Sequence, residues 1–218
     1  MNFMHLIDGP SAAIVVGGTL LATVLRCGLH ASGITVRSLV GTVRPRFDAA
    51  KARAELAVQV QQIHRDGLLR TEPRHFGDRE FDEMTDALIE HRSVAALLTK
   101  HQAHKDGRLK RSETTVATLS QAAEMGPVFG LAGTLIALSQ LTADATPGGM
   151  LSNSIPGAIV TTFYGLMLAN LIFAPLARFV QRRSDEEEAE RQKLIDWLAI
   201  ELAREGIRPG GSREQMAA

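Results

Sequence analysis

Three stretches of the chain are apolar and carry no charged residue. They cover residues 9–25, 125–143 and 155–177. A transmembrane helix needs about 20 mostly apolar residues, and a helix rises about 1.5 Å per residue, so the third stretch is long enough to cross a bilayer with some tilt. The pattern predicts an all-α integral membrane protein with three transmembrane helices and a helical cytoplasmic domain.

The segment between the first two apolar stretches shows apolar residues at helical spacing. Residues 53–70 predict a short helix, and residues 78–120 predict one or two long helices that run into the second span, because no strong breaker follows Lys110. The apolar stripes consist of Leu56, Val60 and Ile63, then Phe81, Met84 and Leu88, and then Leu97, Leu98, Val116 and Leu119.

The tail after the third span has its own pattern. Ser184 with Glu187 three residues later forms a capping box, which predicts that a separate amphipathic helix starts there. Gly206 is a suitable end for it. Its apolar face consists of Ile195, Leu198 and Leu202.

The basic residues are sorted along the chain although the formal net charge is zero. Of 24 Lys and Arg, sixteen lie in residues 26–111 and eight in 178–213, and none lies in 1–25 or 112–177. Lys and Arg concentrate on the cytoplasmic side of membranes, so the N-terminus is expected outside. The predicted organisation is a first transmembrane helix (1–27), a cytoplasmic helical domain (28–122), a second transmembrane helix (123–143), an external loop (144–154), a third transmembrane helix (155–177) and a cytoplasmic tail helix (178–218).

Two alternatives to this topology weigh less. A cleaved signal peptide needs a basic start, but the start MNFMHLID has no Lys or Arg, and Arg26 follows the apolar run. Buried helices of a soluble protein would not explain why 66 consecutive residues lack a basic group.

The spans also carry small and weakly polar residues. Gly126, Gly130 and Thr134 are spaced by four, and Gly165 lies on a similar stripe of the third span, an arrangement that lets helices pack closely in lipid. Thr134 and Thr162 lie near the middle of their spans. Each hydroxyl can bond to its own preceding turn, or the two can line a narrow path for water or a proton. Asn170 in the third span also needs a partner.

Enzymatic and metal chemistry find little support in the sequence. The single cysteine, Cys27, excludes an internal disulfide, and His101 and His104 share a helix face without a third metal ligand at suitable spacing. No hydrolytic arrangement or phosphate-binding loop is apparent, so we expect no catalytic residues, no metal and no cofactor. Basic residues alternate with acidic ones, which speaks against nucleic-acid binding.

The spans contain no Asp, Glu, Lys, Arg or His. Intramembrane proton relays use such groups, so a chain of this kind that conducts protons would need a partner that supplies a membrane carboxylate.

Several segments together resemble the MotA/TolQ/ExbB proton channel family, most closely its flagellar stator A-subunits. The resemblance is strongest in GPVFGLAGTLIAL (126–138) and AIVTTFYGLMLANLIFAPL (158–176), and it is loose between residues 74 and 120. It extends to DGPSAAIVVGGTLLATVL (8–25), to IHRDGLLRTE (63–72) and to the tail from Arg183 to Pro209.

The resemblance implies a bacterial inner-membrane protein with a periplasmic N-terminus and a cytoplasmic C-terminus. It implies a homo-pentamer around a B-type subunit (MotB-, TolR- or ExbD-like) whose membrane aspartate binds the proton, with a cytoplasmic rotor protein as a further partner. By the same resemblance, Thr134 and Thr162 match the pore-facing threonines, and Pro127 and Pro175 match the prolines implicated in coupling. The rotor contacts cannot be matched residue by residue; Arg79, Glu83 and Glu90 lie in the corresponding region, where charges are usually a solvated face.

One departure from the stator pattern leaves the driven machine open. Flagellar A-subunits usually have four spans, and the first has no counterpart here, so the layout matches the TolQ/ExbB type or reflects a misassigned start. The first interpretation is a stator-like subunit that converts proton motive force into work such as flagellar rotation. The alternatives are a TolQ/ExbB-type energiser of outer-membrane processes and a non-conducting membrane scaffold. Whether the ion is a proton or sodium is not encoded in these features.

Overall fold

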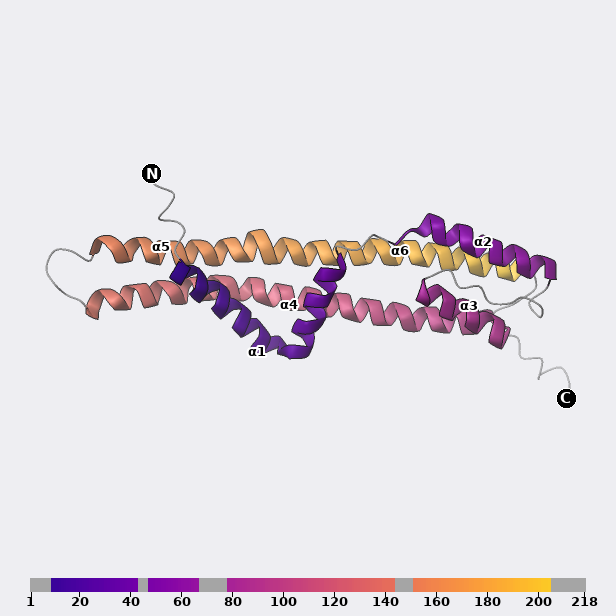
Figure 1. The fold of residues 1–218 in the computed structure, drawn as a ribbon, viewed down its shortest axis with the longest axis horizontal. Helices are drawn as coiled ribbons and strands as arrows, with labels where there is room; N and C mark the ends of the chain where they lie inside the picture. Colours follow the sequence, from indigo (N-terminus) through magenta and orange to yellow (C-terminus); the bar gives the residue numbers. More distant parts are fainter. Residues whose placement is uncertain (1–8, 43–46, 67–77, 144–150, 205–218) are drawn as a thin grey trace. The chain divides into compact units, whose positions relative to one another are not determined.

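The described residues of the chain are all-α. A computed structural model describes residues 9–42, 47–66, 78–143 and 151–204, and no strand occurs among them. The elements in Figure 1 are α1 (Gly9–Thr42), α2 (Ala49–Asp66), α3 (Arg79–His91), α4 (Val94–Ala143), α5 (Leu151–Met167), the π-helix η2 (Leu168–Phe173) and α6 (Ala174–Arg204).

Three helical stretches are long and apolar enough to cross a membrane, as the sequence predicts. They are Gly9–Thr42, Val94–Ser139 and Gly157–Arg204. Each is longer than the apolar run inside it, because the helices continue beyond the spans into the charged segments. The predicted fold class is therefore confirmed.

The chain divides into two compact units. The first, the membrane unit, comprises Met1–Arg44 and Arg111–Arg182; the second, the charged unit, comprises Pro45–Lys110 and Arg183–Ala218. Two helices, α4 and α6, contribute to both units.

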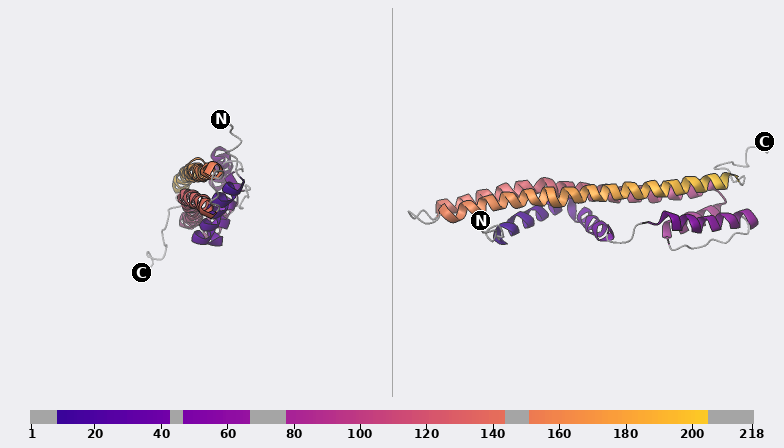
Figure 2. Two further views of the ribbon diagram at one scale, coloured as in Figure 1. Left: turned by 90° about the vertical axis from the view of Figure 1, so that its left-hand side faces the viewer. Right: turned by 90° about the horizontal axis from the view of Figure 1, so that it is seen from above.

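In the membrane unit, α4 and α5 lie side by side and antiparallel, and α1 contacts α5 (Figures 1 and 2). Helix α1 bends in its middle, where Gly28 has φ 85° and ψ 158°. This φ is accessible to glycine at little cost, so the chain can change direction there and continue helically to Thr42. A small apolar cluster at the start of α6 is formed by Leu119, Ala177 and Val180, with Leu39, Val116, Phe173 and Leu176 against it.

In the charged unit, four helices share one apolar core. It contains the predicted stripes of α2 and α3, the first turn of α4 and one face of α6; its members are Ala52, Leu56, Val60, Ile63, Phe81, Met84, Leu88, Val94, Leu97, Leu194, Ile195, Leu198 and Leu202. Leu98 does not belong to it and is 37% exposed, because the neighbouring Leu97 fills the core position.

The segment 78–120 forms two helices rather than one. Asp78 caps the start of α3 by accepting a hydrogen bond from the Glu80 N–H at 3.0 Å. Arg92 ends α3 in the left-handed conformation with φ 51°, and Ser93 caps the first turn of α4 through the Ala95 N–H. From there α4 runs through Pro127 into the second span, as predicted.

The helix boundary predicted at Ser184 is wrong. Helix α6 starts at Ala174 and passes through Ser184 without interruption. The helix is unbroken from Ala174 to Arg204, and pairs such as Arg191 with Glu187 support it one turn apart. The predicted end at Gly206 lies outside the described residues, as do residues 144–150 of the external loop predicted over 144–154. The last four residues of that predicted loop are helical instead, because α5 begins at Leu151.

Candidate functional site

Glycines bring the backbones of α4 and α5 together. A methyl group placed on Gly126 would lie 2.8 Å from the carbonyl oxygen of Gly165, and one on Gly165 would lie 2.5 Å from the carbonyl oxygen of Gly126. At Gly130 it would lie 3.1 Å from the carbonyl oxygen of Thr161. The two backbones therefore meet closely at these three glycines, as small residues in membrane helices allow.

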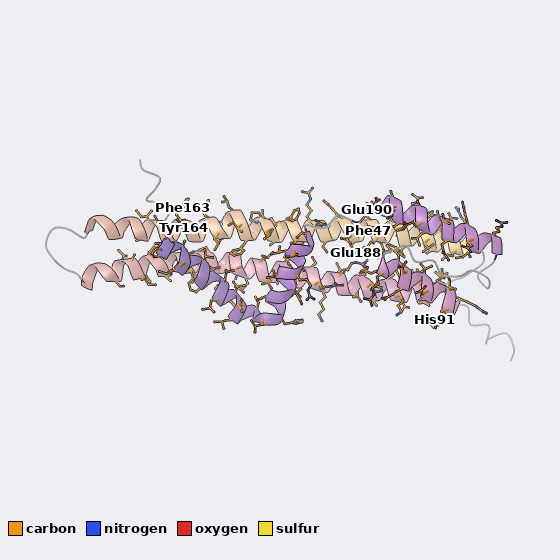
Figure 3. All side chains as sticks on the ribbon, in the orientation of Figure 1. Phe47, His91, Phe163, Tyr164, Glu188 and Glu190 are labelled. Atoms are coloured by element: carbon orange, nitrogen blue, oxygen red, sulfur yellow. The ribbon has the colours of Figure 1, made fainter. Side chains whose placement is uncertain are left out.

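A groove lies further along the same pair of helices. It has a volume of about 470 Å³ and is lined by Thr134 and Leu138 of α4 and by Ala158, Ile159, Thr162, Phe163 and Leu166 of α5. The structure thus brings Thr134 and Thr162, the two threonines singled out in the sequence, to one surface. Figure 3 marks this part of α5 by the labelled Phe163 and Tyr164, whose ring centroids are 6.4 Å apart.

Both hydroxyls of the groove also bond within their own helices. Thr134 Oγ1 donates to the carbonyl of Leu131 at 2.6 Å, and Thr162 Oγ1 donates to the carbonyl of Ala158 at 3.4 Å. A threonine hydroxyl that donates in this way keeps its oxygen lone pairs free to accept. The groove therefore offers two hydroxyl acceptors on an otherwise apolar surface, and its lining contains no ionisable side chain.

The two prolines lie in different backbone settings. Pro127 is inside α4, one residue after Gly126. Pro175 is the second residue of α6 and follows the π-helix η2, at whose end the Ala174 N–H donates to the carbonyl of Ala169. A proline has no N–H and crowds the preceding turn, and the wider π-turn is one way in which a helix accommodates it.

Two close contacts in the membrane unit were not predicted. A methyl group on Gly133 would lie 2.8 Å from Thr161 Cβ, and one on Gly18 of α1 would overlap the ring of Phe129. Thr161 is buried and donates to the carbonyl of Ala158 at 2.9 Å. The sequence analysis selected its neighbour Thr162 from the spacing of small residues. Spacing alone does not show that Thr161 is the threonine that contacts Gly133 of α4.

In the charged unit, the three residues proposed as rotor contacts lie on α3. Arg79 is 91% exposed in its side chain and pairs with Glu83 at 2.8 Å, which in turn lies 3.1 Å from His104 Nε2 on α4. The hydrogen bond from Arg79 lowers the pKa of the Glu83 carboxyl. Glu90 is exposed near the end of α3, beside His91, which Figure 3 labels.

The same unit contains a network of partly buried ion pairs that the sequence did not predict. Arg191 of α6 pairs with Glu187, Asp78 and Glu80, and its guanidinium lies 4.1 Å from the ring centroid of Phe47. Arg108 of α4 pairs with Glu188 at 2.8 Å and with Glu80. Only the pair between Arg191 and Glu187, one turn apart on α6, could be read from sequence spacing.

His101 is the buried histidine of this network. It is 4% exposed, and its Nε2 lies 3.3 Å from Gln192 Oε1, which also accepts a hydrogen bond from Lys105 at 3.0 Å. Because that oxygen can only accept, His101 donates from Nε2–H. Burial lowers the pKa of His101. In the part of the chain that the structure describes, no group of three His, Cys, Asp or Glu is placed to hold a metal ion.

The chain is similar to proteins of bacterial motility. It is 24% identical to motility protein A of Cereibacter sphaeroides over 193 residues, covering 88% of this chain and 76% of the relative. It is 26% identical to motility protein A of Aquifex aeolicus, covering 97% and 84%.

The fold is similar to that of a solved stator structure. The flagellar MotAB stator complex of Bacillus subtilis matches with a TM-score of 0.80 at 17% identity, and the match covers 100% of this chain and 86% of the other. The model of the MotA/TolQ/ExbB proton channel family matches residues 70–193, more than half of the sequence, and includes both α4–α5 contact regions. The chain therefore belongs to the MotA/TolQ/ExbB proton channel family.

Proposed function

We propose that this chain is the A-subunit of a stator-like, ion-conducting motor of the inner membrane. The observation that carries the proposal is the groove in which Thr134 and Thr162 come together between two apolar helices held close by glycines. An ion path needs polar groups on an otherwise water-excluding surface, and these two hydroxyls supply them. Membership of a channel family, rather than an enzyme family, supports the same conclusion.

The proposed assembly is a pentamer of this chain around a B-type subunit. The groove and the three spans contain no carboxylate of their own, so the proton-binding group has to come from the partner. The MotAB composition of the similar complex supports a MotB-like partner for this chain. The exposed outer sides of the spans, such as Leu21, Leu25 and Leu135, would then face lipid or neighbouring subunits.

The work output is proposed to pass through the charged unit. Helix α3 carries Arg79, Glu83 and Glu90, and the first two already pair with each other. Arg79, whose side chain is 91% exposed, and the exposed Glu90 are then the members of this group that are most available to a rotor protein.

The experiment is ion flux through the complex of this chain with its B-type partner, purified together and reconstituted in liposomes. Flux under an imposed membrane potential is recorded with a proton-sensitive and, in parallel, a sodium-sensitive dye, and subunit stoichiometry is measured by native mass spectrometry. Five copies of this chain per particle and flux of one ion are expected. A particle with one or two copies, or no flux of either ion, would contradict the proposal.

Valine at the groove threonines tests the site itself. Thr134→Val and Thr162→Val keep the side-chain shape and remove one hydroxyl each, so we expect the ion flux to fall by about tenfold, the scale of one hydrogen bond to a charged group. The matched control is Thr118→Val, since Thr118 on α4 makes the same type of bond to its own helix, at 2.8 Å to Thr114, but lies outside the groove. If Thr134→Val and Thr162→Val conduct ions as fast as Thr118→Val, the two threonines do not belong to the ion path.

A further inference from the structure

Asn170 is an exposed amide in the middle of an apolar segment. From Gly165 to Ala177 it is the only polar side chain in the sequence. It lies in η2, and the two residues that follow it, Leu171 and Ile172, are exposed apolar side chains. A polar side chain at membrane depth is costly unless it serves a partner, so this position calls for a specific explanation.

The hydrogen bond of Asn170 places its amide beside Leu166, next to the groove, whose lining does not itself include Asn170. Its Nδ2 donates to the carbonyl of Leu166 at 3.0 Å, and Leu166 is one of the groove-lining residues of α5. A carbonyl can only accept, so the amide NH₂ faces Leu166 and the Oδ1 atom is left to accept from elsewhere. Among the described residues, no hydrogen bond to that oxygen is formed. The amide thus adds an unused oxygen next to the α6 end of the groove.

The π-helix and Pro175 leave a second oxygen at the same residue. The carbonyl of Asn170 would accept from residue 174 in an α-helix and from residue 175 in a π-helix. The Ala174 N–H donates to the carbonyl of Ala169 instead, and Pro175 has no N–H. Neither backbone donor is therefore available to the carbonyl of Asn170. A backbone group without a donor at membrane depth is tolerated where it lines a water-filled path.

We propose that Asn170 is an ion-coordinating residue of the ion path, next to the end of the Thr134–Thr162 groove that leads toward α6. Its amide oxygen and its own carbonyl oxygen solvate the monovalent cation, a hydrated proton or a sodium ion, as it leaves the groove. The proposal rests on the proposed channel function and adds a residue beyond the two threonines. Its position one turn after Leu166 makes it the next polar group after Thr162 along this side of the helix.

Flux through the reconstituted complex with the B-type partner tests the proposal. Asn170→Leu keeps a similar volume without oxygen and is expected to lower flux about tenfold or more, while Asn170→Ser, which restores a polar oxygen, retains most of it. The control Leu171→Ala changes the next exposed residue and should leave flux unaltered. Proton-sensitive and sodium-sensitive dyes, used in separate experiments, identify which cation Asn170 coordinates.

Three outcomes would overturn the proposal. Wild-type flux in Asn170→Leu removes Asn170 from the path while the proposed channel function stands. Loss of the assembled particle in that variant, seen by native mass spectrometry, would assign Asn170 to a contact between subunits. Absence of flux in the wild-type complex would overturn the channel function and this inference together.

A measurement independent of flux is the water accessibility of the position. In a Cys27→Ser background, Asn170→Cys in the assembled complex should react with a positively charged methanethiosulfonate reagent, whereas Leu171→Cys should not. Labelling of both positions at the same rate, or of neither, would contradict a hydrated path that includes residue 170.

Discussion

At the scale of single residues, the contact between Gly126 and Gly165 leaves no room for a methyl group. Because the neighbouring atom is a backbone oxygen, which cannot move aside as a flexible side chain would, Gly165→Ala should force α4 and α5 apart. Overpacking of this kind costs about 1–3 kcal/mol. We therefore expect a lower thermal unfolding midpoint for the detergent-solubilised complex, measured by circular dichroism at the helix band.

Gly157 on the same helix provides the control for this prediction. A methyl group there would meet nothing within 4 Å, and alanine favours a helix over glycine by about 1 kcal/mol. Gly157→Ala should therefore unfold at the wild-type temperature or above it. If the two alanine variants unfold at the same temperature, the close approach at Gly165 is not what limits the packing.

His101 gives the charged unit a predictable pH dependence. Burial lowers the pKa of His101 below its ordinary value of 6.5, with the Gln192 hydrogen bond and Glu188 acting in the opposite direction and Arg108 and Lys105 in the same one. Below pH 6.5 the unfolded chain binds a proton that the folded chain resists, so the free energy of unfolding falls as pH decreases. Above pH 6.5 both states are neutral at this residue and the contribution is fully present.

Thermal unfolding between pH 8 and pH 5 checks this sign. The fluorescence of Trp197, the only tryptophan of the chain, reports on the charged unit because this residue packs against its core. His101→Gln can still donate to Gln192 but cannot titrate, so the midpoint of the variant should change less with pH below 6.5. Glu83 does not interfere with this measurement, because the hydrogen bond from Arg79 lowers the pKa of its carboxyl from 4.5, so it becomes protonated only below the pH range scanned. A wild-type midpoint that rises on acidification would contradict the assignment.

At the scale of helices, local spacing predicted which segments are helical but not where each helix starts and stops. The stripes of α2, α3 and α6 were visible because one face of each packs on the shared core. The capping box at Ser184 misled because a capping motif has its effect only where the preceding backbone leaves the helix, and α6 does not. The π-turn of η2 depends on how α6 accommodates Pro175, and periodicity carries no signal for it.

The ion pairs between helices of the charged unit could not be predicted from the sequence, because their partners lie far apart along the chain. Arg191 is 9% exposed in its side chain and lies against Phe47 and Phe81 while it pairs with Asp78 at the cap of α3, with Glu80 on α3 and with Glu187 on α6. Removing one partner of such a network leaves uncompensated charge. We expect Arg191→Ala to destabilise the charged unit by about 1–3 kcal/mol, seen as a lower Trp197 unfolding midpoint.

Lys193 is the matched control for Arg191 on the same helix. Its side chain is 73% exposed and, among the described residues, pairs only with Glu190 one turn away, so Lys193→Ala should change stability by less than about 1 kcal/mol. Arg191→Lys keeps the charge but not the planar contact with the two rings, and an intermediate midpoint is expected. Equal midpoints for Arg191→Ala and Lys193→Ala would show that the network adds no stability.

At the scale of the whole molecule, the fold class could be predicted from the sequence, whereas the groove of Thr134 and Thr162 could not. Charge-free runs and sorted basic residues identified the three membrane helices, since lipid imposes strong constraints on composition. The groove could not be predicted, because it depends on which faces of α4 and α5 meet. Thr134 and Thr162 were singled out from each span alone, and only the packing of the two helices brings them to one surface.

Membrane topology is the prediction that involves the entire chain. If the basic segments 26–111 and 178–213 are both cytoplasmic, as their 16 and 8 basic residues favour, then Cys27 lies on the cytoplasmic side and the connection between α4 and α5 lies outside. Cys27 is the only cysteine and is partly exposed. An impermeant maleimide should therefore label it in inside-out vesicles and not in intact spheroplasts.

A cysteine placed on the other side completes the topology test. In a Cys27→Ser background, Pro147→Cys in the segment between α4 and α5 should show the opposite pattern, with labelling in spheroplasts. The two positions bracket the second span, so they must respond oppositely if that span crosses the membrane. Labelling of Cys27 in spheroplasts would place the charged unit outside, where no cytoplasmic rotor could reach Glu90, and the proposed route from ion flux to mechanical work would fail with it.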